Sequence, residues 1–237
     1  MICHLALSTR RTFDEIRRKH GKEDEGARYT NQLHFCFAIF RISNHFLVCN
    51  LFLSAVLPCT LLHRMDIAVR TGQTRSPKDL LLVALSEVSM QGEPVCLLME
   101  IVGKDDAPKT IARECEAVVK HALLDTDGDA AERLDGALKE LNGLLKGMLV
   151  SGAVQDVHML IGIVGNDGYL NVSHAGRSEA YLVRKGVASQ VTEYSTGKPT
   201  PAFVHIASGK IEQGDAIIFS TERFLRSLTP AQLSRIA

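Results

Sequence analysis

The side chains able to do nucleophilic, redox or metal chemistry are scattered along this sequence. The six cysteines form no CxxC pair and no compact spacing, so neither a zinc knuckle nor a disulfide framework is indicated, and reduced, packed thiols are expected. His158, His174 and His205 lie in expected strands without a second histidine at ligand spacing, and we interpret them as structural. The sequence also lacks a glycine-rich phosphate loop, an HExxH pair and a GxSxG elbow. No single motif therefore specifies a reaction.

The composition bounds the kind of protein that must position these residues. The chain has 237 residues and 46% hydrophobic content, which suits one large globular domain or a domain with a smaller appendage. Its 27 Lys plus Arg are balanced by 27 Asp plus Glu. Nucleic-acid binders and polybasic membrane-surface proteins need an excess of basic side chains, so this balance argues against both classes.

A change of composition near residue 64 divides the chain. Residues 1–64 hold six of the nine phenylalanines and four of the six cysteines, and their apolar tract 33–62 carries only one charge, Arg41. We therefore interpret residues 1–64 as an N-terminal extension of doubtful structure, and residues 65–237 as the main domain.

Three interpretations of the extension remain open. A membrane anchor is one, because residues 46–62 approach the roughly 20 apolar residues that cross a bilayer, although Asn50 and Pro58 interrupt them. A secretory signal is disfavoured by the late apolar tract and the lack of a clean cleavage site. The third is that Met65 is the true start. The domain is expected to be cytoplasmic if the chain starts at Met65, and membrane-anchored if the tract is a genuine anchor.

The hydrophobic periodicity from residue 65 onward predicts an α+β domain of layered sheets and helices rather than a βαβ parallel sheet. A hairpin of two strands is expected at 80–88 and 95–102, followed by an N-capped amphipathic helix after Asp105 and Asp106 and a second helix over 130–149. An antiparallel meander is then expected. The remaining predicted strands are 157–164, 169–175, 179–184, 187–192, 203–206 and 216–220, and helix signals follow at Thr221 and at Thr229 with Pro230.

Several short strings resemble the metal-dependent protein phosphatases of PPM type. The most recognisable is YLNVSHAGRSEAYLVRKGVASQVT, residues 169–192, which resembles the family's "nvGDSraYl.r.g...qlT" strand pair. Residues 208–220 resemble its "sG.l..gD.lll.SDG" segment, Gly72 to Arg75 its "G.vR..NED" opening, and CLLMEIVG, residues 96–103, its "lfvvaDGmG" strand. The resemblance spans about residues 66–237 and implies a β-sandwich flanked by helix pairs, preceded by an extension that lies outside it.

Two Mg or Mn ions bridged by carboxylates, with a metal-activated water attacking phosphoserine or phosphothreonine, are the chemistry that the resemblance implies. Residue by residue, the Asp of the "DG" strand becomes Glu100, and the Gly after it becomes Ile101. Asp79 falls on the Glu of the opening motif, while Leu80 replaces its Asp. These substitutions predict a degenerate site in which the metals are weakened or lost.

The remaining family positions are also altered. Thr221 stands where the family has the "SDG" aspartate, with Glu222 beside it as a substitute ligand if the turn shifts by one residue. Arg75 matches the arginine that contacts substrate phosphate. The final Asp-Asn of the family would lie beyond Ala237, which predicts a C-terminally truncated domain or a fragment. Plain alternatives are a solvated strand end for Glu100, a turn for Asp79 and a surface position for Arg75.

The family's "GDSR" string is replaced by residues 176–179, in which Arg177 and Glu179 exchange the acidic and basic positions. Residues two apart share one face of a strand, which predicts a local ion pair of reversed polarity. Two functions remain open. We favour a non-catalytic pseudophosphatase that binds a phosphopeptide or a protein partner. The alternative is an active serine/threonine phosphatase with Asp79, Glu100 and Glu222 as rearranged ligands.

Overall fold

Two five-stranded antiparallel sheets face each other in the computed structural model. It describes residues 36–42, 65–71, 80–152, 154–192, 201–226 and 229–235, the first two ranges as backbone only. Sheet A has the order β2-β1-β10-β7-β8 and sheet B the order β3-β4-β5-β6-β9. The strands are β1 Cys36–Ile42, β2 Met65–Thr71, β3 Leu80–Val88, β4 Pro94–Gly103, β5 Val154–Val164, β6 Tyr169–Ala175, β7 Ser178–Arg184, β8 Val187–Gln190, β9 Ala207–Lys210 and β10 Ala216–Thr221. The predicted α+β sandwich is confirmed.

The hairpin of β3 and β4 lies where it was predicted. The side chains of β4 alternate between two hydrophobic cores. Leu97 and Met99 of β4 face the helices, whereas Cys96 and Leu98 face sheet A. Successive side chains of a strand point to opposite faces, so Glu100 continues the row that faces sheet A. A carboxylate therefore enters the space between the sheets near the end of β4.

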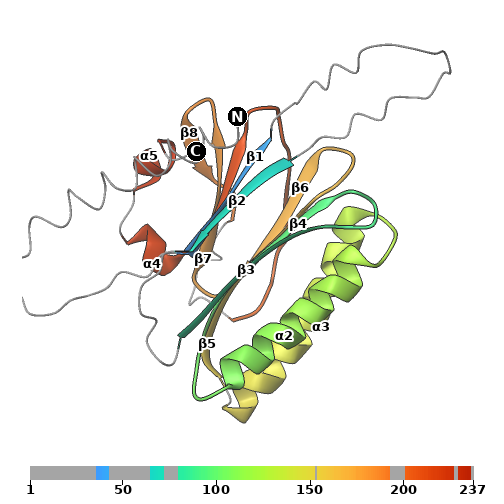
Figure 1. Cartoon of the computed structure of the whole chain (residues 1–237), viewed down its shortest axis with the longest axis vertical. Coiled ribbons are helices and arrows are strands. Elements are labelled where there is room, and N and C mark those ends of the chain that lie inside the picture. Colours follow the sequence, from blue (N-terminus) through green and yellow to red (C-terminus); the bar gives the residue numbers. More distant parts are fainter. Residues whose placement is uncertain are drawn as a thin grey trace, which may run out of the picture.

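A pair of helices covers the outer face of sheet B (Figure 1). Helix α2 is Ala107–Val119 and continues as the π-helical turn η1, Lys120–Leu124; helix α3 is Ala130–Ser151. The Asp129 carboxylate caps α3 by accepting from the Ala131 and Glu132 amides, as N-terminal aspartates do. Asp106 was expected to cap α2 but makes no cap hydrogen bond, because its carboxylate is held by the Lys109 ammonium at 2.9 Å.

The predicted single meander is wrong, because its strands divide between the two sheets. Strands β5 and β6 pair in sheet B, and β7 and β8 pair in sheet A. The chain crosses between the sheets at Gly176, whose φ of 69° lies in the left-handed region that favours glycine. A Cβ there would overlap the Val157 carbonyl oxygen and His158 Nδ1. Glycine at this position therefore allows the close crossing.

Strand β1 was not predicted. It lies between β2 and β10 in sheet A, pairing antiparallel with both, so seven residues of the presumed extension form part of the sandwich. The division of the chain at residue 65 otherwise stays a prediction, and the tract 46–62 proposed as an anchor lies outside the described residues. No helix in the described part of the chain is long and apolar enough to cross a bilayer.

Short helices close the outer face of sheet A, on the side away from α2 and α3 (Figure 1). They are α4, Glu222–Leu225, and α5, Pro230–Leu233, and they bury Phe224 and Leu233 against Tyr181 and Ile218. The strand expected at 203–206 is wrong: β9 begins at Ala207, and Phe203 instead bonds through its backbone to both amide atoms of Asn142 on α3.

Candidate functional site: an arginine-filled end of the sandwich

Glu100 is buried between the sheets and is neutralised by an arginine. Its side chain is only 2% exposed, and its Oε1 accepts a hydrogen bond of 2.7 Å from Arg223 Nε. Arg223 lies in α4, directly after the end of β10, so Glu100 comes from sheet B and its partner from the helix that follows the last strand of sheet A. The Arg223 side chain is 44% exposed and therefore connects the buried carboxylate to the surface.

Two buried oxygen atoms at this end have no hydrogen-bond partner among the described residues. One is Glu100 Oε2 and the other is Thr221 Oγ1. Buried polar atoms are usually hydrogen-bonded, and leaving one unpaired costs free energy. Thr221 is the last residue of β10, so a neutral hydroxyl lies at this strand end.

A second ion-pair group surrounds the start of α4. Arg177 Nη1 donates to Glu222 Oε2 at 3.1 Å, and Arg226 Nη2 donates to Glu222 Oε1 at 2.9 Å. The Glu222 backbone amide also donates to the Arg177 carbonyl oxygen at 3.0 Å. The crossover between the sheets and the first turn of α4 are therefore joined through both backbone and side chains.

His158 orients the crossover that carries Arg177. It stands opposite Glu100 in the pairing of β4 with β5. Its Nδ1 accepts from the Arg177 backbone amide at 3.0 Å, and its Nε2 lies 3.4 Å from Asp156 Oδ2. Because Nδ1 accepts, the ring proton of the neutral imidazole belongs on Nε2, facing Asp156. His158 thus holds the backbone of Arg177, in keeping with the structural role expected for it.

The electrostatic setting keeps Glu222 ionised. Burial raises the pKa of Glu222, but hydrogen bonds from Arg226 and Arg177 outweigh burial and leave this pKa below its ordinary value. Two guanidinium groups on one half-exposed carboxylate favour its charged form.

The local ion pair expected between Arg177 and Glu179 is wrong. Arg177 pairs with Glu222, 45 residues further along the chain, while Glu179 accepts a hydrogen bond from the Tyr181 hydroxyl. Strand β7 begins at Ser178, so Arg177 lies in the crossover and does not share a strand face with Glu179. Burial of the Tyr181 phenol and its hydrogen bond to Glu179 raise the pKa of Tyr181, with burial the larger cause.

Of the four predicted site residues, the structure places two. Glu100 and Glu222 lie at the same end of the sandwich, because Arg223, which binds Glu100, directly follows Glu222 in α4. Asp79 and Arg75 lie outside the described residues. Both described carboxylates are already bound to guanidinium groups. Across the described ranges, no three His, Cys, Asp or Glu side chains converge as a metal site would require. The described residues therefore do not fit a two-metal centre.

Arg223 and Arg226 were missed by sequence reasoning. They lie in a short apolar and charged segment without a recognisable motif, and at this turn the family pattern draws attention only to the acid. A signal was present in the sequence: Arg223 and Arg226, three residues apart, follow the segment that resembles "SDG". Residues at this spacing lie near each other on a helical turn.

Comparisons with known proteins agree with the fold. No family model and no curated protein matches the sequence. Among solved structures, the chain is similar to a serine/threonine phosphatase of S. agalactiae, with 14% identity and a TM-score of 0.53, covering 69% of this chain and 81% of that chain. It is also similar to the catalytic domain of the phosphatase PstP in complex with two manganese ions, with 15% identity, a TM-score of 0.44, and coverage of 67% and 90%. The sandwich thus has the fold of PPM-type phosphatases.

Proposed function

We propose that this protein is a non-catalytic module of PPM-phosphatase fold that binds a phosphopeptide or protein partner. The observation that carries the proposal is the buried ion pair between Glu100 and Arg223, which puts a guanidinium on the carboxylate that the resemblance assigns to metal. In this proposal the arginine replaces the metal as the cation between the sheets.

The charges around this pair support the same proposal. Arg177, Arg223 and Arg226 bring three positive charges to an end of the sandwich where Glu100 and Glu222 bring two negative ones. A Mg²⁺ or Mn²⁺ ion needs several oxygen ligands to compensate for its lost hydration, and it would have to displace guanidinium groups to obtain them. A two-metal clamp on a transferring phosphoryl group needs still more carboxylates.

The test is a calorimetric titration of Mn²⁺ into the full 237-residue chain, with Glu100→Gln measured in parallel. Asp127→Asn provides a control, because Asp127 is an exposed carboxylate in the loop between η1 and α3. Circular dichroism verifies that each sample is folded. We expect no Mn²⁺ heat from any of the three proteins. Micromolar binding that disappears in Glu100→Gln but persists in Asp127→Asn would overturn the proposal.

Hydrolysis provides an independent readout of the same proposal. The wild-type chain is incubated with a phosphoserine or phosphothreonine peptide and millimolar Mn²⁺, and released phosphate is measured. We expect release at the rate of the buffer blank. Release that depends on Mn²⁺ and falls in Glu100→Gln would identify an active phosphatase, with Glu100 as a metal ligand.

A further inference from the structure

Glu222 is held as a bound anion would be held. Arg177 and Arg226 approach different oxygens of its carboxylate, at 3.1 and 2.9 Å, from two separate segments of the chain. Both arginine side chains are about half or more exposed, at 49% and 65%. The Glu222 side chain is 37% exposed, so it can leave the two arginines by rotating toward solvent.

The backbones that carry the two arginines are also held in place before any ligand arrives. The backbone of Arg177 is held at both of its polar groups, by His158 Nδ1 and by the Glu222 amide. Arg226 lies at the end of α4, which packs through buried Phe224 on the outer face of sheet A. A site whose backbone is already ordered loses less entropy on binding.

We propose that Arg177 and Arg226 form a binding site for the phosphate group of a phosphorylated peptide, and that the Glu222 carboxylate occupies this site when the ligand is absent. This inference rests on the proposed function, because it names the ligand of the same non-catalytic site. Arg223 contributes a third guanidinium on the same helical turn, and its only hydrogen bond to a described side chain is the one to Glu100.

The chemistry favours exchange of the carboxylate for a phosphate. A phosphoserine carries a charge of about −1.5 to −2 at pH 7 and three acceptor oxygens, against one charge and two oxygens for Glu222. Guanidinium forks bind phosphate oxygens in pairs, so each arginine gains contacts in the exchange. The balanced charge of the whole chain argues against a polyanion such as nucleic acid as the natural ligand.

The experiment is a titration of a labelled phosphoserine peptide with neutral flanking residues into the full chain, followed by fluorescence anisotropy in EDTA. The unphosphorylated peptide and inorganic phosphate as a competitor distinguish a phosphopeptide from free phosphate. Variants Arg177→Gln and Arg226→Gln remove the donors, and Glu222→Gln removes the internal anion. Arg113→Gln is the matched control, because it removes one exposed positive charge from α2 on the far side of sheet B.

We expect the phosphopeptide to bind and the unphosphorylated peptide not to bind. Each arginine variant should weaken binding about tenfold, and Glu222→Gln should tighten it about threefold. Arg113→Gln should bind as the wild type does. A gain of affinity in Glu222→Gln cannot result from misfolding, so this variant keeps the inference testable if an arginine variant is unstable.

Equal affinity for both peptides, or unchanged affinity in Glu222→Gln and both arginine variants, would overturn the inference. If inorganic phosphate competes with the same affinity as the phosphopeptide, the claim that the ligand is a peptide would be overturned. Because the titration contains EDTA, failure here in a chain that also binds no Mn²⁺ leaves the non-catalytic proposal intact. Mn²⁺-dependent hydrolysis would instead overturn the proposed function itself.

Discussion

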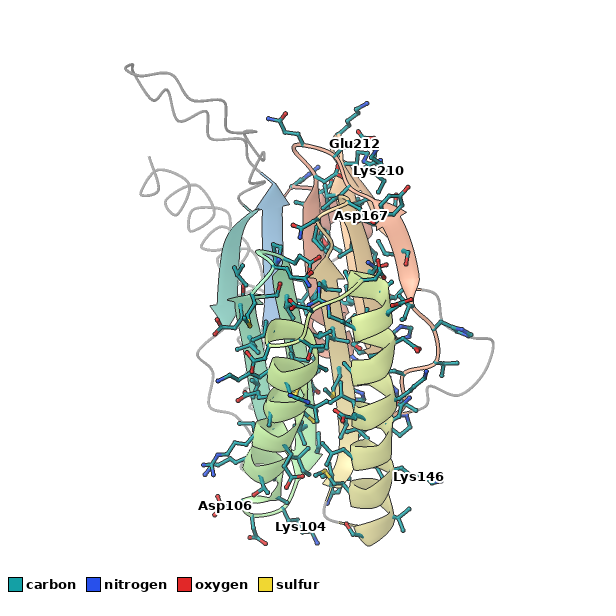
Figure 2. The ribbon with its side chains drawn as sticks, turned by 90° about the vertical axis from the view of Figure 1, so that its right-hand side faces the viewer. Lys104, Asp106, Lys146, Asp167, Lys210 and Glu212 are labelled. Carbon is teal, nitrogen blue, oxygen red and sulfur yellow. The ribbon has the colours of Figure 1, made fainter. Side chains whose placement is uncertain are left out.

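Glu93, directly before strand β4, and Glu100, near the end of that strand, are two buried glutamates, each paired with an arginine. Glu93 adjoins the turn labelled by Asp167 in Figure 2, whereas Glu100 lies toward the end labelled by Lys104 and Asp106. Glu93 pairs with Arg133, and both side chains are 4% exposed. Glu100 is equally buried, but its partner Arg223 is 44% exposed.

The two glutamates also differ in how many of their carboxylate oxygens are hydrogen-bonded. Glu93 uses both oxygens, with Arg133 and the Ser89 hydroxyl on one and the Asn166 amide on the other. Arg133 also donates to the carbonyl oxygens of Leu123 and Thr126, so this pair joins three loops. Glu100 leaves Oε2 without a partner among the described residues. The enclosed pair also has one buried atom without a partner among the described residues, Arg133 Nε. The two pairs therefore differ mainly in exposure: Arg133 is enclosed, whereas Arg223 reaches the surface.

The largest effect is expected at the enclosed end, from Arg133→Ala. This substitution leaves Glu93 buried without a cation and removes two hydrogen bonds to loop carbonyls, so we expect a loss of about 3–5 kcal/mol in the free energy of unfolding. Urea denaturation measures it. A loss no larger than that of Arg223→Ala would remove the contrast between the two ends.

Gly176→Ala should follow in magnitude. The added methyl group overlaps the Val157 carbonyl oxygen and His158 Nδ1, and the positive φ is unfavourable for alanine. We expect a destabilisation of about 2–3 kcal/mol, measured by urea denaturation. Gly186→Ala is the matched control, because that glycine has a φ of 78° but open space around its Cβ. Equal losses would show that the crossover is not tightly packed.

Arg223→Ala should cost less than Arg133→Ala, about 1–2 kcal/mol, because solvent reaches Glu100 once the half-exposed arginine is gone. The double variant with Glu100→Gln should recover most of this loss, since the remaining side chain is then uncharged. Thermal denaturation of the two single variants and the double variant measures the coupling. Additive losses would mean that Arg223 does not neutralise Glu100.

The smallest effect is expected from Glu222→Gln, a few tenths of a kcal/mol in the free energy of unfolding at neutral pH, as for other exposed ion pairs. Its pH dependence is more informative. The pKa of Glu222 is lowered in the folded state, so its contribution is present above 4.5, the ordinary value, and is lost as pH falls through the folded pKa. The stability difference between wild type and variant should therefore vanish in acid. A difference that grows as pH falls would contradict this assignment.

The sequence predicted the elements in which local pattern and tertiary structure agree. Strand β4 is a continuous apolar run bounded by a polar turn, and helix α3 has an apolar period of 3.6 residues; both lie where expected within a few residues. The crossover at Gly176 was missed, because a glycine that changes sheets has the same local pattern as one in a hairpin turn. Strand β1 was missed because its CFAIFRI sequence lies in a tract whose continuous apolar character resembles an anchor.

The candidate site was predictable mainly on its acidic side, since among its arginines only Arg177 was singled out, and its expected partner was wrong. The resemblance identifies Glu100 and Glu222, but the pairing of Glu100 with Arg223 spans 123 residues and depends on the relative position of the two sheets. No spacing in the sequence encodes such a contact. Where one acid of a known pattern is replaced, the acids that remain still need a neutralising cation. Only the tertiary structure shows which side chain supplies it.

The central claim is that an arginine, and not a metal, is the cation bound to Glu100. Its most direct test is the thermal midpoint of the full chain in EDTA and in millimolar Mn²⁺, with Glu100→Gln measured alongside. A ligand that binds only the folded state raises the midpoint. We predict the same midpoint in both buffers for the wild type. A rise in Mn²⁺ that is absent from Glu100→Gln would contradict the claim.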